Sequence, residues 1–282
     1  YLVSEFAAKH VKVALSADGG DELFCGYPKY WLTVDRVAAM QRNPMLCKTI
    51  SCVPSGILES VGRRFAGNKL LKIKELTRST GPLARNAFIY GQHVLSNFQL
   101  ERLMAVSQHT AWLPQKALWD EFQSSDPLAK MLAIDLASYH PDDIHVKVDR
   151  ASMANSLEAR EPFLDQEIVE FALGMPMSYK LPNGDVSQSK KILRSILYKH
   201  LDRSLVERPK MGFGVPLDRW LNRELKGLVD SMLDPKRIEA EGLFSKDYIQ
   251  QLRRSFEARP KQELNKIWNL VVFQMWHEKW IA

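Results

Sequence analysis

The sequence predicts an α/β unit at its N-terminal end, followed by a mainly helical remainder. A short run of alternating valines, from Val11 to Leu15, is typical of a buried strand, and the small residues of 16–20 end it. From residue 32 onward, apolar residues recur mainly at every third or fourth position. We therefore expect a mostly helical chain with one or two short parallel strands, in which residues 1–31 form the end of an α/β part and 32–282 a mainly helical part.

The residues around the strand fit this interpretation in chain order. Residues 1–10 carry apolar side chains at helical spacing and predict a helix that leads into the strand. After the loop, Asp21 and Glu22 stand where the first turn of a helix favours negative charge. Because α/β folds place nucleotides and substrates at the carboxyl ends of strands, this loop is the first candidate site.

The loop chemistry admits two interpretations. Asp18, Asp21 and Glu22 lie beside Gly19 and Gly20, which allow a ligand to approach the backbone closely. Carboxylates repel phosphates, so a phosphate site here requires a divalent cation, and magnesium is bound by one or two carboxylates plus phosphate oxygens. The alternative is a turn in which Asp21 caps a helix.

The remainder is divided into short predicted helices by prolines and glycines. Trp112, Trp119 and Phe122 fall at helical spacing and are expected in the core. The C-terminal segment, residues 264–276, is expected to be a helix with a strongly apolar face formed by Leu264, Ile267, Trp268, Val271, Met275 and Trp276.

Residues 144–158 combine two periodicities. Ile144, Val146 and Val148 alternate as in a strand, whereas the spacing from Val148 to Glu158 is helical, and we predict a helix. Asp149, Arg150, Glu158 and Arg160 then form a charged set that is either a paired structural network or part of a substrate site.

Further along, residues 181–185 predict a turn and 190–200 a basic amphipathic helix. Its expected inner face consists of Ile192, Leu193, Ile196 and Leu197. Residues 209–216 contain two glycines and two prolines, which predict a loop. Lys210 in that loop is a point charge suited to phosphate, or a surface lysine on a connector.

Composition narrows the function classes. The net charge of +6 is spread over separated basic stretches, so no nucleic-acid partner is expected. Three cysteines without a C-x-x-C pair and seven scattered histidines indicate neither a disulfide framework nor a zinc site. No apolar run reaches the length of a membrane span, and a cytoplasmic protein is expected.

Three stretches resemble, in order, the synthetase domain of glutamine-dependent asparagine synthetases. They are S-A-D-G-G-D-E-L-F-C-G-Y (16–27), K-V-D-R-A-S-M-A-N-S-L-E-A-R-E-P-F-L-D (147–165) and P-K-M-G-F-G-V-P-L-D-R-W-L (209–221). The resemblance implies an ATP pyrophosphatase-like (adenine nucleotide alpha hydrolase-like) α/β fold. It also implies an ATP-dependent carbon–nitrogen ligase that converts aspartate to asparagine with ammonia from glutamine.

The resemblance also implies roles for individual residues. Ser16 and Ala17 would lie against ATP, Asp18 would be the general base, and Asp21 would hold Mg²⁺. Lys210 would stabilise charge on the phosphates. Four further residues would contact the substrate or support those that do: Glu22, Arg150, Glu158 and Arg160.

Two features of the family are missing from these residues. Neither the pyrophosphate loop S-G-G-x-D-S nor the cysteine nucleophile of the N-terminal glutaminase domain occurs. We therefore expect the C-terminal portion of a longer protein, with the glutaminase domain as its partner in the same chain and no turnover by these residues alone. The oligomeric state stays open, with a homodimer among the options.

Three positions depart from the family pattern. Ala17, Cys25 and Met211 each stand where the family has glycine, which affects geometry without removing a reacting group. Two alternatives therefore remain: a related amidotransferase for another carboxylate, in a polysaccharide or natural-product pathway, and a non-catalytic homologue.

Overall fold

The computed structural model describes residues 1–65, 69–106, 114–207 and 214–281. The chain forms two compact units, one made of 1–42, 80–91 and 113–209, the other of 43–79, 92–112 and 210–282. Among the described residues, no helix is both long enough and apolar enough to cross a membrane.

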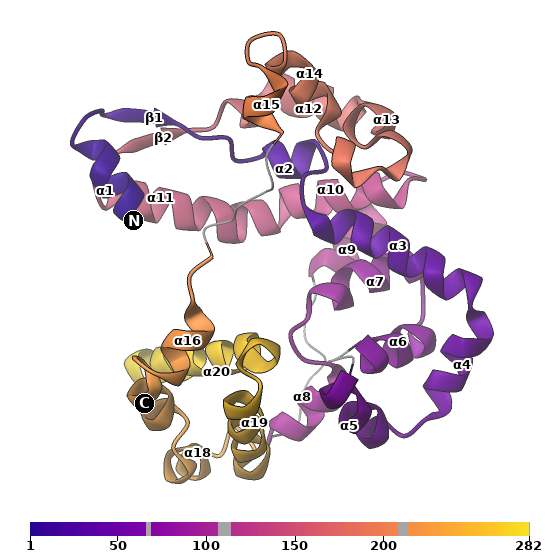
Figure 1. Cartoon of the computed structure of the whole chain (residues 1–282), viewed down its shortest axis with the longest axis vertical. Helices are drawn as coiled ribbons and strands as arrows, with labels where there is room; N and C mark the ends of the chain where they lie inside the picture. The colour runs from indigo at the N-terminus through magenta and orange to yellow at the C-terminus, as the bar shows by residue number, and fades with distance from the viewer. Residues whose placement is uncertain (66–68, 107–113, 208–213, 282) are drawn as a thin grey trace. The chain divides into compact units, whose positions relative to one another are not determined.

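A parallel pair of short strands lies in the first unit. β1 (Val13–Leu15) pairs with β2 (Glu158–Arg160) in the register Val13 to Glu158, Ala14 to Ala159 and Leu15 to Arg160. Figure 1 shows the two strands side by side, with α11 (Val146–Met153) running along them. The predicted parallel sheet in a mostly helical chain is thus confirmed.

The prediction that β1 is buried is wrong. Val13 is 39% exposed and Leu15 is 76% exposed, although both are apolar. The physical reason is that, among the described residues, β1 has a single neighbouring strand and its outer side chains have no covering layer.

The helices of the first unit pack around two apolar clusters. One cluster contains Tyr30, Phe88, Met131 and Ile134, all nearly inaccessible to solvent. Trp119 is buried in it and Phe122 packs against it, as predicted, whereas Trp112 lies outside the described residues. The helices not yet named are α1 (Leu2–Ala8), α2 (Gly20–Leu23), α3 (Pro28–Arg42), α7 (Leu83–Gln92), α9 (Pro114–Glu121), α10 (Pro127–Ala137), α12 (Gln166–Gly174), α13 (Met177–Lys180), α14 (Lys191–Leu197) and α15 (Arg203–Val206).

The segment with two periodicities is helical at first and extended at its end. A π-helix, η1 (His140–His145), leads into α11, so the alternation of Ile144, Val146 and Val148 is not a strand. The helix ends at Met153, however, and Ser156 takes a left-handed conformation (φ 54°) that turns the chain into β2. The prediction of a helix reaching Glu158 is therefore wrong.

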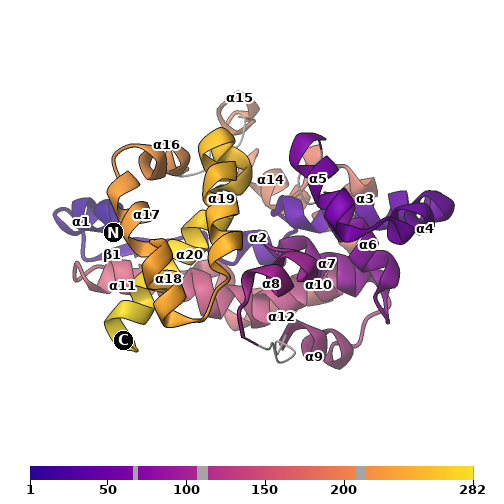
Figure 2. The same cartoon turned by 90° about the horizontal axis from the view of Figure 1, so that it is seen from below.

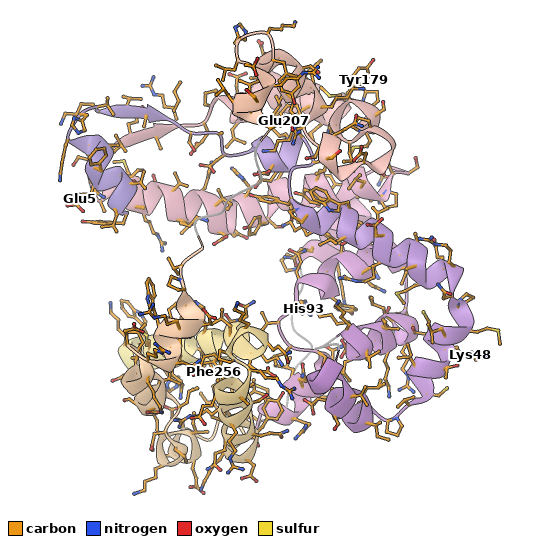
Figure 3. The ribbon with its side chains drawn as sticks, viewed as in Figure 1. Glu5, Lys48, His93, Tyr179, Glu207 and Phe256 are labelled. Atoms are coloured by element: carbon orange, nitrogen blue, oxygen red, sulfur yellow. The ribbon has the colours of Figure 1, made fainter. Side chains whose placement is uncertain are left out.

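The short 3-10 helices of this unit are η2 (Pro162–Leu164), η3 (Pro182–Gly184) and η4 (Val186–Gln188). The first follows β2, and the second coincides with the predicted turn at 181–185. In α14, Ile192 and Leu193 pack inward as predicted. Ile196 and Leu197 do not, being 50% and 38% exposed. After α15, Glu207 accepts from Arg194 of α14 at 3.1 Å, and Figure 3 shows its side chain.

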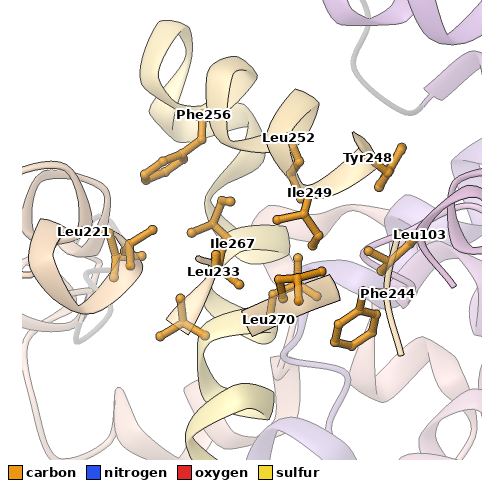
Figure 4. Packing of buried hydrophobic residues seen from close by; sticks show 13 residues of the cluster. Leu103, Leu221, Leu233, Phe244, Tyr248, Ile249, Leu252, Phe256, Ile267 and Leu270 are labelled. Carbon is orange, nitrogen blue, oxygen red and sulfur yellow. The ribbon is translucent and has the colours of Figure 1, made fainter. Parts of the chain in front are cut away.

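The second unit is all helical among its described residues, apart from one antiparallel bridge between Met104 and Phe244. Its core joins side chains of α8, α16, α17, α18, α19 and α20, and Figure 4 shows them converging around Ile267 and Leu270. Figure 2 shows α16 to α20 grouped together. The helices are α4 (Pro44–Cys52), α5 (Ser55–Phe65), α6 (Lys69–Arg78), α8 (Asn97–Leu103), α16 (Leu217–Asn222), α17 (Lys226–Met232), α18 (Pro235–Glu241), α19 (Lys246–Ala258) and α20 (Pro260–Trp280).

The predicted apolar face of the C-terminal helix is only partly internal. Ile267 and Val271 are fully buried, and Leu264 and Trp268 pack against the same core. Met275 and Trp276 are 45% and 49% exposed, which corrects the prediction for the last turns of α20.

Candidate functional site

The carboxyl ends of β1 and β2 meet at one edge of the strand pair. The backbone N–H of Ser16, directly after β1, donates to the carbonyl of Arg160 at 2.8 Å and so extends the ladder by one residue. The Ser16 hydroxyl then donates to Asp18 Oδ2 at 2.5 Å. Ala17 is exposed and its carbonyl accepts from the Gly20 N–H at 3.2 Å. Ser16, Ala17 and Asp18 therefore lie in one tight loop at the strand ends, where ligands bind in such folds.

The glycines of this loop make room for the segment that follows β2. Gly19 has φ 85°, and a Cβ there would stand 2.5 Å from Leu164 Cδ2. A Cβ on Gly20 would approach the ring of Phe163 to 3.2 Å. The P-F-L segment after β2 thus packs directly on the glycine loop, and two stretches that are distant in sequence form one structure. Only glycine accepts both the left-handed backbone and this contact.

Asp21 forms an ion pair that the sequence did not predict. Its Oδ1 lies 2.8 Å from the ammonium of Lys190, and both side chains are partly exposed. Lys190 has φ 58° at the start of α14, and its N–H donates to the carbonyl of Phe24 at 3.2 Å. Gly26 leaves space for the pair, since a Cβ there would meet both Asp21 Oδ1 and Lys190 Cε.

The sequence predicts Lys190 on a basic helical face, because S-K-K continues into an amphipathic pattern. The left-handed conformation that turns its side chain toward Asp21 leaves no signal in that pattern. The structure therefore places Lys190, which the sequence did not single out, beside the glycine loop.

Glu22 points in the opposite direction, into the protein. It is 1% exposed, and its Oε1 accepts from the Tyr27 hydroxyl at 3.1 Å and lies 3.2 Å from His140 Nδ1. Burial raises the pKa of Glu22, but the contacts with His140, with its own backbone N–H and with Tyr27 outweigh burial, so the pKa is lowered. Glu22 is thus placed to support the loop, and its burial argues against direct contact with a substrate.

Next to Tyr27, the partly buried ammonium of Lys29 is surrounded by aromatic rings. The Lys29 ammonium lies 2.7 Å from Asp135 Oδ2 and 4.0 Å from the centroid of the Tyr139 ring, with Tyr27 and Tyr30 also within cation–π range. Burial raises the pKa of Asp135, and Lys29 opposes this shift. Burial also raises the pKa of Tyr139, to about 12. Lys29 thus braces the start of α3 against α10 next to the loop.

The predicted charged set is only partly brought together. Arg160 Nε donates to Glu158 Oε1 at 2.7 Å on an exposed face of β2. Asp149 and Glu158 line a cavity of about 450 Å³ between α11, η1 and β2, together with His145 and Glu161. Arg150 is exposed on α11 and does not line this cavity. The four residues therefore do not form a single network: Glu158 and Arg160 form a surface ion pair, and Asp149 and Glu158 line the cavity.

The donor chemistry of the loop suits magnesium shared with phosphate. Within the part of the chain that the structure describes, no three His, Cys, Asp or Glu side chains gather into a group that could hold a metal ion by themselves. Magnesium held by one or two carboxylates and phosphate oxygens needs no such group, and the partly exposed Asp21 can supply one ligand. Lys210 lies outside the described residues, and its predicted role stays a prediction.

Comparison with known proteins bears on all three motifs together. The family model described as asparagine synthase matches residues 1–278. The chain belongs to the asparagine synthase family. This membership spans both units and includes the glycine loop, the E-A-R-E-P-F-L-D segment and the loop with Lys210.

Individual members of the asparagine synthase family are similar along nearly the whole chain. Asparagine synthetase [glutamine-hydrolyzing] 1 of Bacillus subtilis is 30% identical over 98% of this chain and 42% of its own length. A putative asparagine synthetase [glutamine-hydrolyzing] of Mycobacterium bovis is 28% identical over 98% of this chain and 41% of its own length. The chain thus spans about two fifths of these relatives. No solved structure matches it.

Proposed function

We propose that this chain carries the synthetase chemistry of an asparagine synthase: ATP-dependent formation of a carbon–nitrogen bond on the side-chain carboxylate of aspartate. The carboxylate would first be activated as an acyl-adenylate with release of pyrophosphate, and ammonia would then displace AMP to give asparagine. The observation that supports this best is the Asp21–Lys190 pair beside Ser16 and Asp18 at the strand ends, in a member of this family.

Each group in the loop has a charge suited to one requirement of the reaction. Asp21 would hold magnesium, which neutralises charge on the departing pyrophosphate. Lys190, and Lys210 in the later loop, would offer point charges to the phosphates, so that Lys190 exchanges part of its contact with Asp21 for the nucleotide. Asp18, oriented by the Ser16 hydroxyl, would accept a proton from the attacking amine.

The remaining requirements are proposals about the longer protein. Because the relatives named above are more than twice as long as this chain, we propose that a segment with the S-G-G-x-D-S loop completes the ATP site. A glutaminase domain in the same protein would supply ammonia, and the product of the two activities would be asparagine.

The decisive experiment measures pyrophosphate release by the full-length protein with ATP, Mg²⁺ and ammonia, with and without aspartate. Release that depends on aspartate, with an equal amount of asparagine, is the expected result. Release that depends on another carboxylate would identify a related amidotransferase. Binding of ATP without release on any carboxylate would contradict the proposal and indicate a non-catalytic homologue.

Two neighbouring lysines provide a matched test of the site. Lys190→Met removes the cation beside Asp21, whereas Lys191→Met removes one whose ammonium lies 6.0 Å from the centroid of the Tyr179 ring. We expect the first variant to lower pyrophosphate release by roughly 10²-fold and the second to stay within about twofold of wild type. Equal rates in the two variants would remove Lys190 from the site.

Asp21→Asn tests the magnesium ligand. The amide keeps the size of the side chain but loses its charge, so we expect the apparent affinity for Mg²⁺ to fall and pyrophosphate release to be nearly abolished. The measurement is a Mg²⁺ titration of pyrophosphate release at fixed ATP. An unchanged titration would exclude Asp21 as a ligand.

A further inference from the structure

The π-helix η1 brings two histidines into contact at its ends. His140 and His145 are five residues apart, and their ring centroids lie 4.5 Å from each other at an interplanar angle of 60°. The hydrogen bonds of a π-helix join residues five positions apart, so these two rings lie on successive turns and meet edge to face, and π-helical turns are frequent at functional sites.

His140 is buried against the carboxylate of the glycine loop. It is 3% exposed, and its Nδ1 lies 3.2 Å from Glu22 Oε1. Its Nε2 has no hydrogen-bond partner among the residues that the structure describes. Because burying polar groups is unfavourable unless they meet one another, the contact with the buried Glu22 carboxylate is what fixes the position of this imidazole.

His145, which contacts the ring of His140, also lines the cavity between α11, η1 and β2. Its Nε2 lies 3.4 Å from Glu161 Oε2, and both side chains line the cavity of about 450 Å³ beside β2. A continuous series of side-chain contacts therefore leads from the interior of the glycine loop to the residue that follows β2. Its members are Glu22, His140, His145 and Glu161.

The helix α2, which contains Glu22, depends on these side-chain contacts for its orientation. α2 has four residues, lacks a side-chain cap, and lies between Gly19 (φ 85°) and Cys25 (φ 59°), both left-handed. A single helical turn is not stable by itself, so tertiary contacts must fix its orientation. Leu23 anchors one face of α2 in the core, and Glu22 anchors another through Tyr27 and His140. Asp21, next to Glu22, takes its direction from the same turn.

We propose that His140 is a positioning residue: through its contact with Glu22 it fixes the orientation of α2 and hence of the Asp21 carboxylate, with His145 and Glu161 bracing the imidazole from the side of β2. This inference rests on the proposed function, because it assigns Asp21 a part in binding magnesium ATP.

The kinetic experiment uses the full-length protein and three variants. His140→Leu fills the volume of the ring without a donor, His140→Asn restores a nitrogen near the position of Nδ1, and His200→Leu is the matched control on an exposed histidine. We expect His140→Leu to raise KM for magnesium ATP by roughly 10- to 100-fold with a smaller change in kcat, because a displaced Asp21 weakens phosphate binding. His140→Asn should recover most of that loss, and His200→Leu should match wild type.

A folded His140→Leu variant with wild-type KM would overturn the inference. So would an equal loss in the Leu and Asn variants, which would indicate packing rather than positioning.

A second measurement does not depend on activity. In the 282-residue chain labelled with ¹⁵N-histidine, we expect the His140 signal to show a proton on Nδ1 and a bare Nε2, and to change on Glu22→Gln. A bare Nδ1 with the proton on Nε2, or no response to Glu22→Gln, would overturn the contact. If the wild-type protein releases no pyrophosphate, the proposed function fails, and this spectrum alone decides whether His140 holds Glu22.

Discussion

Cys25 is a fully buried residue in a left-handed conformation, with φ 59° and no exposed surface. Burial raises the pKa of its thiol to about 12, so it stays protonated over the range in which an unfolded cysteine ionises. The resemblance marked this position as a departure from glycine. The structure shows that the side chain enters the core beside Tyr30.

A pH dependence of stability follows from Cys25. Above the unfolded pKa of about 9.0 the unfolded thiol ionises and the folded thiol does not, so stability is lost as pH rises from 9 toward 12. We expect wild type to lose about 1.4 kcal/mol more than Cys25→Ala between pH 8 and pH 10, measured by urea unfolding. Parallel pH profiles of the two proteins would contradict this.

Residue identity predicted where part of the candidate site lies in the fold, and backbone conformation determined the position of the rest. Ser16, Asp18 and Asp21 are where the loop pattern placed them, because a strand followed by glycines has few geometries. Lys190 and His140 were missed, since one depends on a left-handed residue and the other on a π-helical turn. Neither conformation has a periodicity that the sequence displays.

At the scale of elements, the glycine loop and the P-F-L segment form one packing unit. Gly19→Ala would place a methyl group 2.5 Å from Leu164 Cδ2 in a backbone conformation that alanine avoids. We expect a loss of about 2 to 3 kcal/mol in the free energy of unfolding. Gly174→Ala in α12 is the control, because nothing lies within 4 Å of its added methyl group. Denaturant unfolding measures both, and equal stabilities would contradict the packing argument.

The presence and type of elements with one dominant periodicity were predicted correctly, but the residues at which they end or leave the core were not. The helix of residues 264–276 and the parallel strands are present, but Met275 and Ile196 are exposed where the pattern placed them inside. Apolar spacing reports a helix face and does not report where the neighbouring element ends. For the same reason, the predicted helix over 144–158 missed the change to β2 after Ser156.

At the scale of the whole molecule, the two units have separate cores. Ile134 belongs to a core of the first unit and Ile267 to the core of the second, and neither is exposed. The chain passes from one unit to the other several times, so sequence order alone did not predict this division. The predicted boundary at residue 31 remains a prediction.

Separate cores predict separate local responses to mutation. Ile267→Ala should cost about 2 to 5 kcal/mol and lower amide-exchange protection mainly in α17, α19 and α20. Ile134→Ala should do the same mainly in α3, α7 and α10. Hydrogen exchange followed by mass spectrometry compares the two. Uniform loss of protection over both units in either variant would show a single cooperative structure.

The pairing of β1 with β2 sets the order of events during synthesis. Val13 meets Glu158, so a ribosome must add ~145 residues after the first strand before its neighbour exists. At about 5 to 20 residues per second, β1 and its glycine loop wait roughly 7 to 30 s in the cell before β2 is available to pair with them. Throughout that interval an apolar strand edge is open to other chains. We expect the nascent chain to need chaperone cover from the time residue 15 emerges until residue 160 does.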